Sequence, residues 1–445
     1  MIENDAFKLL LINLFHLNPD DIANIFCTTF NKMMVLIVTL ADKHQACPYC
    51  GFTAPKIKEY VTKEITHSAL TTQKCIIKYR ARRYKCPCCG KTYYEFNPFV
   101  FKSQKISILT VHNILKDLKD FNETFTSVAR RYHVSPTSVS TIFDNHVDIG
   151  RNPLPEIINF DEVYAFKSEK SKYVCVLLDF KKQIPVDVLP NRKKEYLLNY
   201  FQKIPLEERK KVKYACSDMY EVYRDVVHKV FPCSCMLLDY FHLSQDFHRK
   251  MNEVRIKVMK GYKDDKASDE YYLLKKFNWL LFKNPEDEDK YGRLFDVERE
   301  RKYNSHFKSY MNYYDLRRKL LEINNNITIC YSLKLELVDF YSKSTIDNAQ
   351  VNLEHLIRSC IDTNIEEMIA FSNNLINWKQ EIINSFTIVG TEYKVEADKG
   401  QVVVCNKKVN NAIIENRNKI IKCIKNNANG YTNWSRFRNR VMYVL

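Results

Sequence analysis

Two short cysteine motifs constrain the fold of this chain more than any other feature. They read CPYCG at residues 47–51 and CPCCG at residues 86–90. A C-x-x-C turn lets two thiolates point toward one ion, and the glycine behind it relieves the crowded backbone. Two such motifs complete a tetrahedral site, so the sequence predicts a zinc ribbon. The expected zinc ligands are Cys47, Cys50, Cys86 and Cys89.

Other interpretations of the cysteines stay open at this point. Cys88 breaks the x-x spacing but could replace a neighbouring ligand, and the four ligands could instead be ordinary buried cysteines. Redox pairs are less favoured because both motifs carry the same glycine. No signal peptide is indicated at the N-terminus, so 15 cysteines do not predict a disulfide framework. The longest apolar run, residues 33–40, is too short to cross a membrane, and we expect a cytoplasmic protein.

The chain is strongly basic, with a formal net charge of +16. Such a surplus favours a polyanionic partner, first of all nucleic acid, although a merely basic soluble protein is the alternative. Residues 56–105 hold twelve Lys and Arg against three Glu, and KYRARRYKC at residues 78–86 alternates charged with aromatic side chains. We expect this segment to contact DNA phosphates rather than to be a solvated strand face. The candidate contacts are Arg80, Arg82, Arg83 and Lys85.

Residues 125–146, FTSVARRYHVSPTSVSTIFDNH, have the rhythm of a helix-turn-helix. Ser135 can cap the second helix, and Pro136 suits its first position. Val139 and Ile142 are expected to face the core of this domain. The outward side of the second helix would then read bases in the major groove, whereas a purely structural helical hairpin is the alternative. The candidate base-reading residues are Thr137, Ser138 and Ser140.

Residues 155–243 alternate between strand-like and helix-like runs, which predicts an α/β domain. The order is three strands, a helix, a strand, a helix and a strand, as in the ribonuclease-H-like fold. In that fold an acid on the first strand lies beside one at the end of the fourth, here Asp161 and Asp218. Two close carboxylates repel each other unless a cation lies between them, and Mg²⁺ or Mn²⁺ suits such oxygen ligands. The sequence therefore predicts a catalytic metal site.

Four further polar residues of this domain need an assignment. Glu162 should face away from Asp161, because neighbours on a strand point to opposite sides, and we expect it to form a salt bridge. Asp179 ends the second strand and is expected in a turn. Asp239 and His242 form a D-x-x-H motif, which we place on the fifth strand beside the active site. Asp239 could instead be the second metal ligand, and His242 could be a structural residue or a contact to DNA.

Three stretches carry a resemblance to a known family. They are NFDEVYAF, ACSDMYEVYRDVVHKVFPCSCMLLDYFH and IIENRNKIIKCIKNNANGYTNWSRFRNRV. Together they resemble the ISL-three family of bacterial insertion-sequence transposases, over essentially the whole chain. The resemblance implies a zinc ribbon, a helix-turn-helix and a DDE catalytic core that is interrupted by a helical insertion before its third acid.

The resemblance also implies that the third acid is Glu415, so that Asp161, Asp218 and Glu415 would hold magnesium. The family usually has Glu-Gly-x-Asn here, whereas this chain reads ENRN at residues 415–418, without the glycine. Glu392 and Glu396 are competing acids in a segment that we expect to be irregular. Basic residues near the C-terminus would lie along DNA, or form only a solvated helix face. They are Lys419, Lys422, Lys425, Arg436, Arg438 and Arg440.

Together these features predict a multidomain α/β protein with a ribonuclease-H-like core that an all-helical insertion interrupts. Its function would be DNA transposition: binding the inverted repeats that end its element, hydrolysing phosphodiesters and transferring strands into target DNA. We expect a homodimer or larger assembly on DNA, associated with the bacterial nucleoid. An inactive transposase-derived regulator and a ribonuclease-H-like nuclease are the alternatives. The expected segments are a lead (1–40), the zinc ribbon (41–105), the helix-turn-helix (106–150), the first part of the core (155–243), the insertion (244–385) and the core completion with the third acid and a basic C-terminal helix (386–445).

Overall fold

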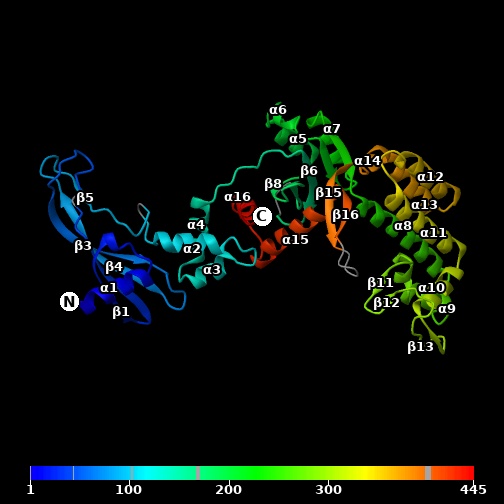
Figure 1. The fold of residues 1–445 in the computed structure, drawn as a ribbon, viewed down its shortest axis with the longest axis horizontal. Coiled ribbons are helices and arrows are strands. Elements are labelled where there is room, and N and C mark those ends of the chain that lie inside the picture. Colours follow the sequence, from blue (N-terminus) through cyan, green and yellow to red (C-terminus); the bar gives the residue numbers. More distant parts are fainter. Residues whose placement is uncertain (1, 44, 102–103, 167–170, 396–401) are drawn as a thin grey trace. The chain divides into compact units, whose positions relative to one another are not determined.

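A computed structural model describes residues 2–43, 45–101, 104–166, 171–395 and 402–445 of the chain. The chain divides into two compact units, each described by itself below. The first unit contains residues 1–151, 163–172 and 417–445, and the second contains residues 152–162 and 173–416. Figure 1 shows the elements in chain order. No helix in the described ranges is long and apolar enough to cross a membrane.

The first unit begins with a five-stranded sheet that combines the lead segment with the cysteine-rich segment. Its strand order is β1-β2-β4-β3, with β5 paired to β4, and β2 and β4 run parallel. Ile12 of α1 and Phe15, the residue after that helix, share one buried core with Leu36 of β2 and Ile77 of β4. The lead therefore packs as part of this sheet domain. The elements are α1 (Ile2–Leu14), a 3₁₀ turn η1 (Pro19–Asp21), β1 (Ile22–Phe30), β2 (Met33–Leu40), β3 (Lys56–Thr66), β4 (Cys75–Lys85) and β5 (Thr92–Tyr94).

A small helical domain follows in the same unit. It consists of α2 (Ile108–Asp117), α3 (Phe125–Arg131) and α4 (Pro136–His146). Ser135 caps α4 by accepting the N–H of Ser138, and Pro136 occupies the first turn, as predicted. Val139 and Ile142 are buried in the core that the helices share, which confirms the predicted inward face.

The C-terminal helix α16 (Trp434–Val444) completes this helical domain. Arg436 forms an ion pair with Asp144 of α4. Arg440 is only 1% exposed and donates to the carbonyl oxygens of Asp120 and Glu123. The expectation that Arg440 lies along DNA is therefore wrong, because its side chain is buried and its Nη2 donates to the loop between α2 and α3.

The second unit is built on a buried five-stranded sheet of order β10-β9-β6-β7-β8. Strands β10, β9 and β6 run parallel, and β7 and β8 run antiparallel. Leu197 of α5 and Val226 of α7 pack against Phe160 on one face of the sheet. All five strands and both helices predicted over residues 155–243 are present. They are β6 (Ile157–Val163), β7 (Val174–Asp179), β8 (Pro185–Leu189), α5 (Lys194–Gln202), the short α6 (Leu206–Arg209), β9 (Tyr214–Ser217), α7 (Glu221–Val230) and β10 (Cys235–Leu238).

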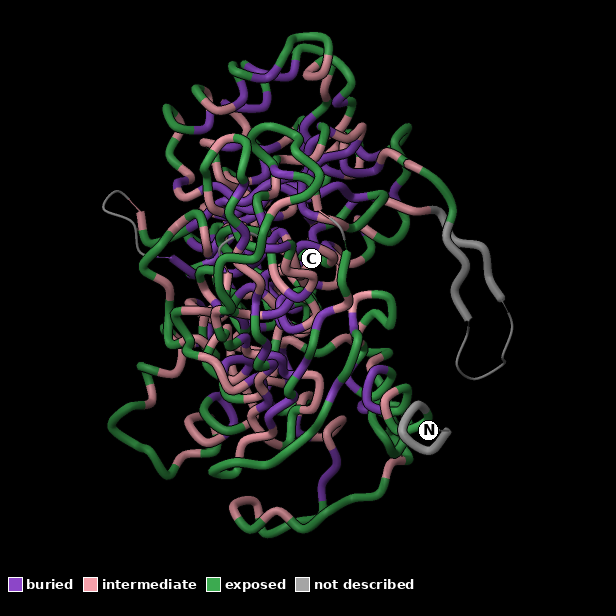
Figure 2. The backbone as a smooth tube through the Cα atoms, turned by 90° about the vertical axis from the view of Figure 1, so that its left-hand side faces the viewer, coloured by how far each residue is buried: buried purple, intermediate pink, exposed green. Residues whose placement is uncertain are grey.

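The insertion that follows is mostly helical and has one core of its own. Its helices are α8 (Tyr240–Lys260), α9 (Asp269–Lys276), the 3₁₀ helix η2 (Asn278–Phe282), α10 (Tyr313–Glu322), α11 (Asn325–Lys343), α12 (Ala349–Asp362), α13 (Glu366–Asn377) and α14 (Lys379–Asn384). Buried and exposed positions alternate along these helices, and Figure 2 colours the backbone by burial.

The prediction of an all-helical insertion is wrong in one region. Two short hairpins interrupt the helices, β11 (Glu288–Asp289) with β12 (Gly292–Arg293), and β13 (Lys302–Asn304) with β14 (Ser309–Met311). Gly292 lies at the first turn with φ +97°, a conformation that glycine adopts without strain. These strands are two or three residues long and mostly exposed, so they leave no apolar alternation in the sequence.

The chain returns to the sheet through a separate hairpin of β15 (Ile388–Val395) and β16 (Val402–Lys408), followed by α15 (Ala412–Asn427). Val409 and Ile413 pack against Ile157, Cys216 and Leu237 on the second face of the main sheet. The start of α15 therefore covers the face opposite to α5 and α7.

Candidate active site and metal centres

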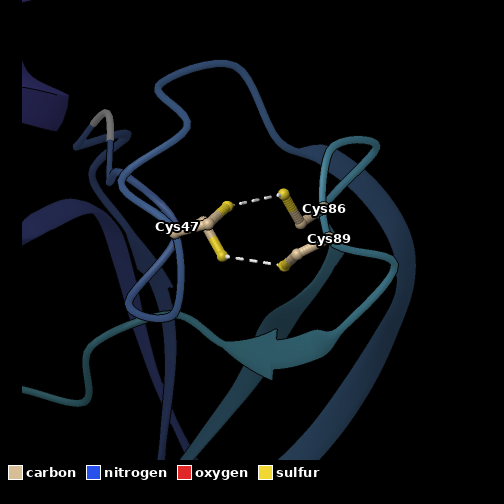
Figure 3. A group of neighbouring side chains, drawn as sticks. Cys47, Cys86 and Cys89 are labelled. Carbon is tan, nitrogen blue, oxygen red and sulfur yellow. Dashed lines mark hydrogen bonds between the residues drawn. The ribbon is translucent and has the colours of Figure 1, made fainter.

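The four predicted zinc ligands come together in the first unit. The Sγ atoms of Cys47, Cys50, Cys86 and Cys89 all lie within 4.8 Å of one another. Cys47 lies 3.7 Å from Cys89, and Cys50 lies 3.5 Å from Cys86, measured between sulfurs (Figure 3). A tetrahedron with Zn–S bonds of about 2.3 Å has sulfurs about 3.8 Å apart. The group thus has the size of a Cys₄ zinc site.

The two cysteine turns have matching backbones. Gly51 has φ +76° and donates its N–H to the carbonyl of Cys47, at 2.9 Å. Gly90 has φ +71° and donates to the carbonyl of Cys86, also at 2.9 Å. Both glycines adopt the left-handed conformation, in which a side chain would strain the turn.

The thiols of the cysteine group differ in pKa: a hydrogen bond with the Phe52 backbone lowers the pKa of Cys50, but burial and hydrogen bonds with the neighbouring thiols outweigh it and raise that pKa to about 12. Backbone N–H groups of Cys89 and Cys88 lower the pKa of the Cys86 thiol to about 7, which favours the thiolate that binds metal. Cys88 is exposed and lies outside the group of four. Four sulfur ligands would leave no open coordination position, so the arrangement fits a structural ion.

The second candidate site lies at the carboxyl ends of three parallel strands. Asn159 of β6 pairs with Cys216 of β9, and Leu238 of β10 pairs with Ser217. Extending these registers by one or two residues sets Asp161, Asp218 and Asp239 level with one another. Neighbouring strands are about 4.8 Å apart, so three carboxylates share one edge of the sheet.

The three aspartates also share a face of the sheet. Ile157, Cys216 and Leu237 point toward the start of α15, as shown by their common core with Val409. Because side chains alternate along a strand, Asp161, two pleats beyond Ile157, points to this face too. Asp218 and Asp239 each follow Cys216 and Leu237 by two residues and point the same way.

Glu415 reaches this face from a segment 254 residues after Asp161. It lies in the first turn of α15, and two buried asparagines attach the start of that helix to β6. Asn159 donates to the side-chain oxygen of Asn411 at 2.7 Å, and Asn411 donates to the carbonyl of Phe160 at 3.3 Å. Neither Asn159 nor Asn411 was predicted as a site residue from the sequence. A polar residue inside the apolar run INF at residues 158–160 was the available signal.

The side chains of Asp239, His242 and Glu415 form a compact group whose potential ligand atoms lie within 4.8 Å of one another. The His242 Nε2 lies 3.8 Å from the Asp239 Oδ2 and 3.8 Å from the Glu415 Oε1. Asp161 and Asp218 are not members of this group. The three acids predicted from the sequence therefore do not form one compact group. Glu415 lies beside Asp239 and His242, whereas Asp161 and Asp218 are level with Asp239 at the ends of the neighbouring strands.

The prediction that the D-x-x-H motif lies on the fifth strand is wrong. Strand β10 ends at Leu238, Asp239 is the residue before α8, and His242 lies in the first turn of that helix. A spacing of three residues places side chains on one face of a helix, which brings His242 back over Asp239. On a continuous strand the same two residues would have pointed to opposite faces.

The surroundings of the carboxylates are those of a cation site. Burial raises the pKa of Asp218, and the nearby charges of His242 and Arg192 oppose this rise. Burial also raises the pKa of Asp239, and the nearby charge of His242 opposes this rise. The Asp218 Oδ1, the Asp239 Oδ2 and the His242 Nε2 are buried and have no hydrogen-bond partner among the described residues. Buried acceptors of this kind are costly unless an ion or water satisfies them, so these residues fit a divalent cation.

Two expectations about neighbouring acids are confirmed. Glu162 forms an ion pair with Arg192, as expected, and accepts the hydroxyl of Tyr223 at 3.2 Å. Asp179 accepts the backbone N–H groups of Lys181 and Lys182, at 2.9 and 3.0 Å, and so shapes a turn.

The competing third acids have different positions. Glu392 belongs to β15, paired with Cys405 of β16, so its segment is a regular hairpin rather than the irregular segment that was expected. Glu396 lies outside the described residues.

The four candidate phosphate contacts on β4 differ in their surroundings. Arg80 and Lys85 are exposed, and Arg83 pairs with Glu59 at 2.7 Å. Arg82 pairs with the buried Glu95 at 2.9 Å and donates to the carbonyl oxygens of Ala41 and Leu40. The guanidinium of Arg82 thus links β4 to its own domain, whereas the side chains of Arg80 and Lys85 are accessible.

The three candidate base-reading residues of α4 are also unequal. Thr137 is exposed and lines a surface cavity of about 510 Å³ with Thr141 and Asn145. The hydroxyl of Ser138 lies 2.8 Å from that of Ser135, and Ser140 donates to the carbonyl of Thr137 at 3.0 Å. The two serines therefore serve the helix itself, and Thr137 presents its side chain outward.

Comparison with known proteins agrees with this arrangement. A family model described as a transposase, of the ISL-three DDE type, matches residues 158–397, more than half of the chain. The matched range includes Asp161, Asp218, Asp239 and His242 and ends before Glu415. The chain is also 19% identical over 392 residues to the transposase for insertion sequence element IS1001 of Bordetella parapertussis, covering 87% of this chain and 86% of that protein. The chain therefore belongs to the ISL-three family of DDE transposases.

Proposed function

We propose that this transposase binds the ends of its insertion sequence, cleaves them by metal-dependent phosphodiester hydrolysis and joins the released ends to target DNA. One observation carries the proposal. Asp161, Asp218 and Asp239 end three neighbouring parallel strands at one level, and α15 carries Glu415 over the same face.

The arrangement of the second unit supports a ribonuclease-H-like core. Three strands come first, and the fourth and fifth are added beyond the first, each after a helix. We propose Asp161, Asp218 and Glu415 as the catalytic acids, with Asp239 and His242 in support. Asp239 is a strong candidate for a metal ligand as well, since it is level with Asp218 and beside Glu415.

The proposed chemistry follows from the groups at this edge. Asp161, Asp218, Asp239 and Glu415 would hold Mg²⁺ or Mn²⁺ through carboxylate oxygens, at an edge open to a DNA strand. When bound, such ions activate water and stabilise the leaving oxygen. His242 lies within reach of two of the acids and would donate to a phosphate oxygen. The released 3′-hydroxyl would then attack a target phosphodiester in line.

DNA binding is assigned to the first unit. We propose that zinc at the four cysteines rigidifies the ribbon, and that Arg80, Arg83 and Lys85 on β4 contact phosphates. Thr137 on α4 would approach base edges, with α2 to α4 acting as a helix-turn-helix. Paired cleavage of two ends requires at least two copies, so a homodimer on nucleoid DNA is part of the proposal.

A cleavage and strand-transfer experiment tests this function. The full chain would be incubated with duplexes that carry the element's own ends, with Mg²⁺ or Mn²⁺, and with Asp161→Asn and Glu415→Gln as variants. We expect end-specific nicks and joined products from the wild type alone. Binding without any cleavage would instead support an inactive regulator, and cleavage of RNA–DNA hybrids in preference to the ends would support a nuclease.

A further inference from the structure

Arg192 is a charged side chain at the edge of the acid site that the proposed chemistry leaves unused. It lies between β8 and α5 and forms an ion pair with Glu162, next in sequence to Asp161. Its guanidinium lies over the rings of Tyr173 and Tyr220, 4.6 and 4.8 Å from their centres. Tyr173 precedes β7, and Tyr220 follows Asp218 by two residues. Contacts with the ends of three strands therefore place Arg192 at the edge that carries the acids.

The surroundings of Arg192 hold its guanidinium in place but use few of its N–H donors. Its side chain is 28% exposed, and two aromatic rings and one carboxylate restrict its rotamers. Within the described part of the chain, only its Nη1 has a hydrogen-bond acceptor, the carboxylate of Glu162. A guanidinium has five N–H donors in a planar fork that suits the oxygens of a phosphate.

The backbone next to Arg192 also favours an anion. Helix α5 starts two residues later, and no side chain caps its N-terminus. Helix α7 starts after Tyr220, again without a side-chain cap. Uncapped N–H groups and the positive ends of two helix dipoles thus flank the guanidinium. Five carboxylates lie at this edge and would repel a DNA strand. A fixed positive charge, in addition to metal ions, would offset that repulsion. The five acids are Asp161, Glu162, Asp218, Asp239 and Glu415.

We propose that Arg192 binds a phosphodiester oxygen of the DNA strand that enters the active site, at or next to the bond that is cleaved. Glu162, Tyr173 and Tyr220 act as positioning residues that hold the guanidinium in place. The inference rests on the proposed function, because it takes that strand as the ligand of the acid edge. It also accounts for the acid pair at residues 161 and 162: the first acid serves the metal site and the second orients the phosphate-binding arginine.

The test measures binding without cleavage. The full chain would be titrated with an end-bearing duplex in Ca²⁺, which replaces the catalytic ion, across a range of salt concentrations. Arg192→Gln removes the charge, Arg192→Lys keeps it, and Arg224→Gln is the matched control. Arg224 lies over the ring of Trp378 at 4.3 Å and donates to the carbonyl of Asn377, so it is a packed arginine of the same unit without a described contact to the acids.

Each phosphate contact contributes about 0.9 to the slope of log affinity against log salt for duplex DNA. We expect Arg192→Gln to lower that slope by about one contact, and Arg192→Lys and Arg224→Gln to preserve it. Methylphosphonates placed singly along the strand locate the contact. Neutralising the contacted phosphate should weaken wild-type binding about tenfold and leave Arg192→Gln binding unchanged.

An unchanged slope with Arg192→Gln, together with equal sensitivity to every methylphosphonate, would overturn the proposal and make Arg192 purely structural. The proposal would also be overturned if the phosphate whose neutralisation affects the wild type but not Arg192→Gln lay far from the cleavage position. A failure of the proposed function would give a different result. The wild type would not cleave DNA in Mg²⁺, while the salt dependence of binding would still differ between wild type and Arg192→Gln.

Discussion

The two candidate metal centres of this transposase are built in opposite ways. The cysteine group comes from two five-residue turns with matching backbone hydrogen bonds, and its four sulfurs all lie within 4.8 Å of one another. The acid group draws on β6, β9, the β10–α8 junction and α15, and buried oxygens of Asp218 and Asp239 lack partners among the described residues. A closed sulfur tetrahedron suits an ion that holds a fold, whereas open oxygens suit an ion that must also meet a substrate.

The largest expected effect comes from opening the cysteine group. Cys86→Ser should abolish zinc binding, because metal-coupled folding of such sites is worth on the order of 10 kcal/mol. We expect zinc content to fall from one ion per chain to none and the ribbon to become protease-sensitive, as read by metal analysis and limited proteolysis. Cys88→Ser is the matched control, being exposed and outside the group. Zinc loss from the control alone would reverse the ligand assignment.

The next largest effect concerns the acid group and should leave zinc untouched. Asp218→Asn removes a charge that the proposed metal site needs, which costs several kcal/mol of transition-state stabilisation. The cleavage rate in Mg²⁺ should fall about a thousandfold, with unchanged zinc content. Asp225→Asn serves as control, since Asp225 pairs with Lys194 on the helical face. Equal cleavage by wild type and Asp218→Asn would remove Asp218 from the site.

A smaller effect tests whether the acid site depends on a contact between distant segments. Asn411→Ala removes the mutual hydrogen bonds with β6, and unpaired buried groups cost about 1–3 kcal/mol. We expect a lower melting temperature and a cleavage rate reduced about ten- to hundredfold. Asn410→Ala loses only a local bond to the N–H of Ala412 and should stay within a few-fold of wild type. Similar losses in both variants would mean that the helix start, rather than the link to β6, matters.

The smallest effect concerns the glycines of the cysteine turns. Gly90→Ala places a side chain at φ +71°, which costs about 1 kcal/mol or slightly more. Zinc affinity should fall about fivefold in a competition titration with a chelator. Gly150→Ala is the control, because Gly150 has no positive φ and its added Cβ would meet no neighbouring atom within 4 Å. A loss as large as that of Cys86→Ser would show that the backbone, rather than the ligands, limits the site.

Much of the fold could be predicted from the sequence because it depends on interactions between residues close together in the chain. The capping of α4 by Ser135, the apolar run of β6 and each cysteine turn depend on residues within one short segment. The short hairpins of the insertion were not readable, since strands of two or three exposed residues carry no periodic signal. The D-x-x-H motif was misplaced for a related reason: LLDYFH fits a strand and a helix start equally well, and only the end of β10 separates them.

Charge proved the least informative pattern. Arg80 and Arg82 look alike in KYRARRYKC, yet Arg80 is exposed and Arg82 is held by Glu95 and two carbonyl oxygens. Arg440 stands in a basic tail that suggests a DNA contact, and it is one of the most buried side chains of the molecule. A charged residue becomes a surface group or an internal link according to which carbonyls and carboxylates the fold brings to it, and these come from distant segments.

By itself the sequence determined the four cysteines, the strands and helices of the core, and the family to which the chain belongs. Those features depend on spacing, capping and alternation, which act over a few residues. Only the tertiary structure decided that Asp161, Asp218 and Asp239 are level, that Glu415 meets Asp239 and His242, and that Arg192 stands at the same edge. Strand register and helix docking are set by packing across more than two hundred residues of chain, and no local pattern encodes them.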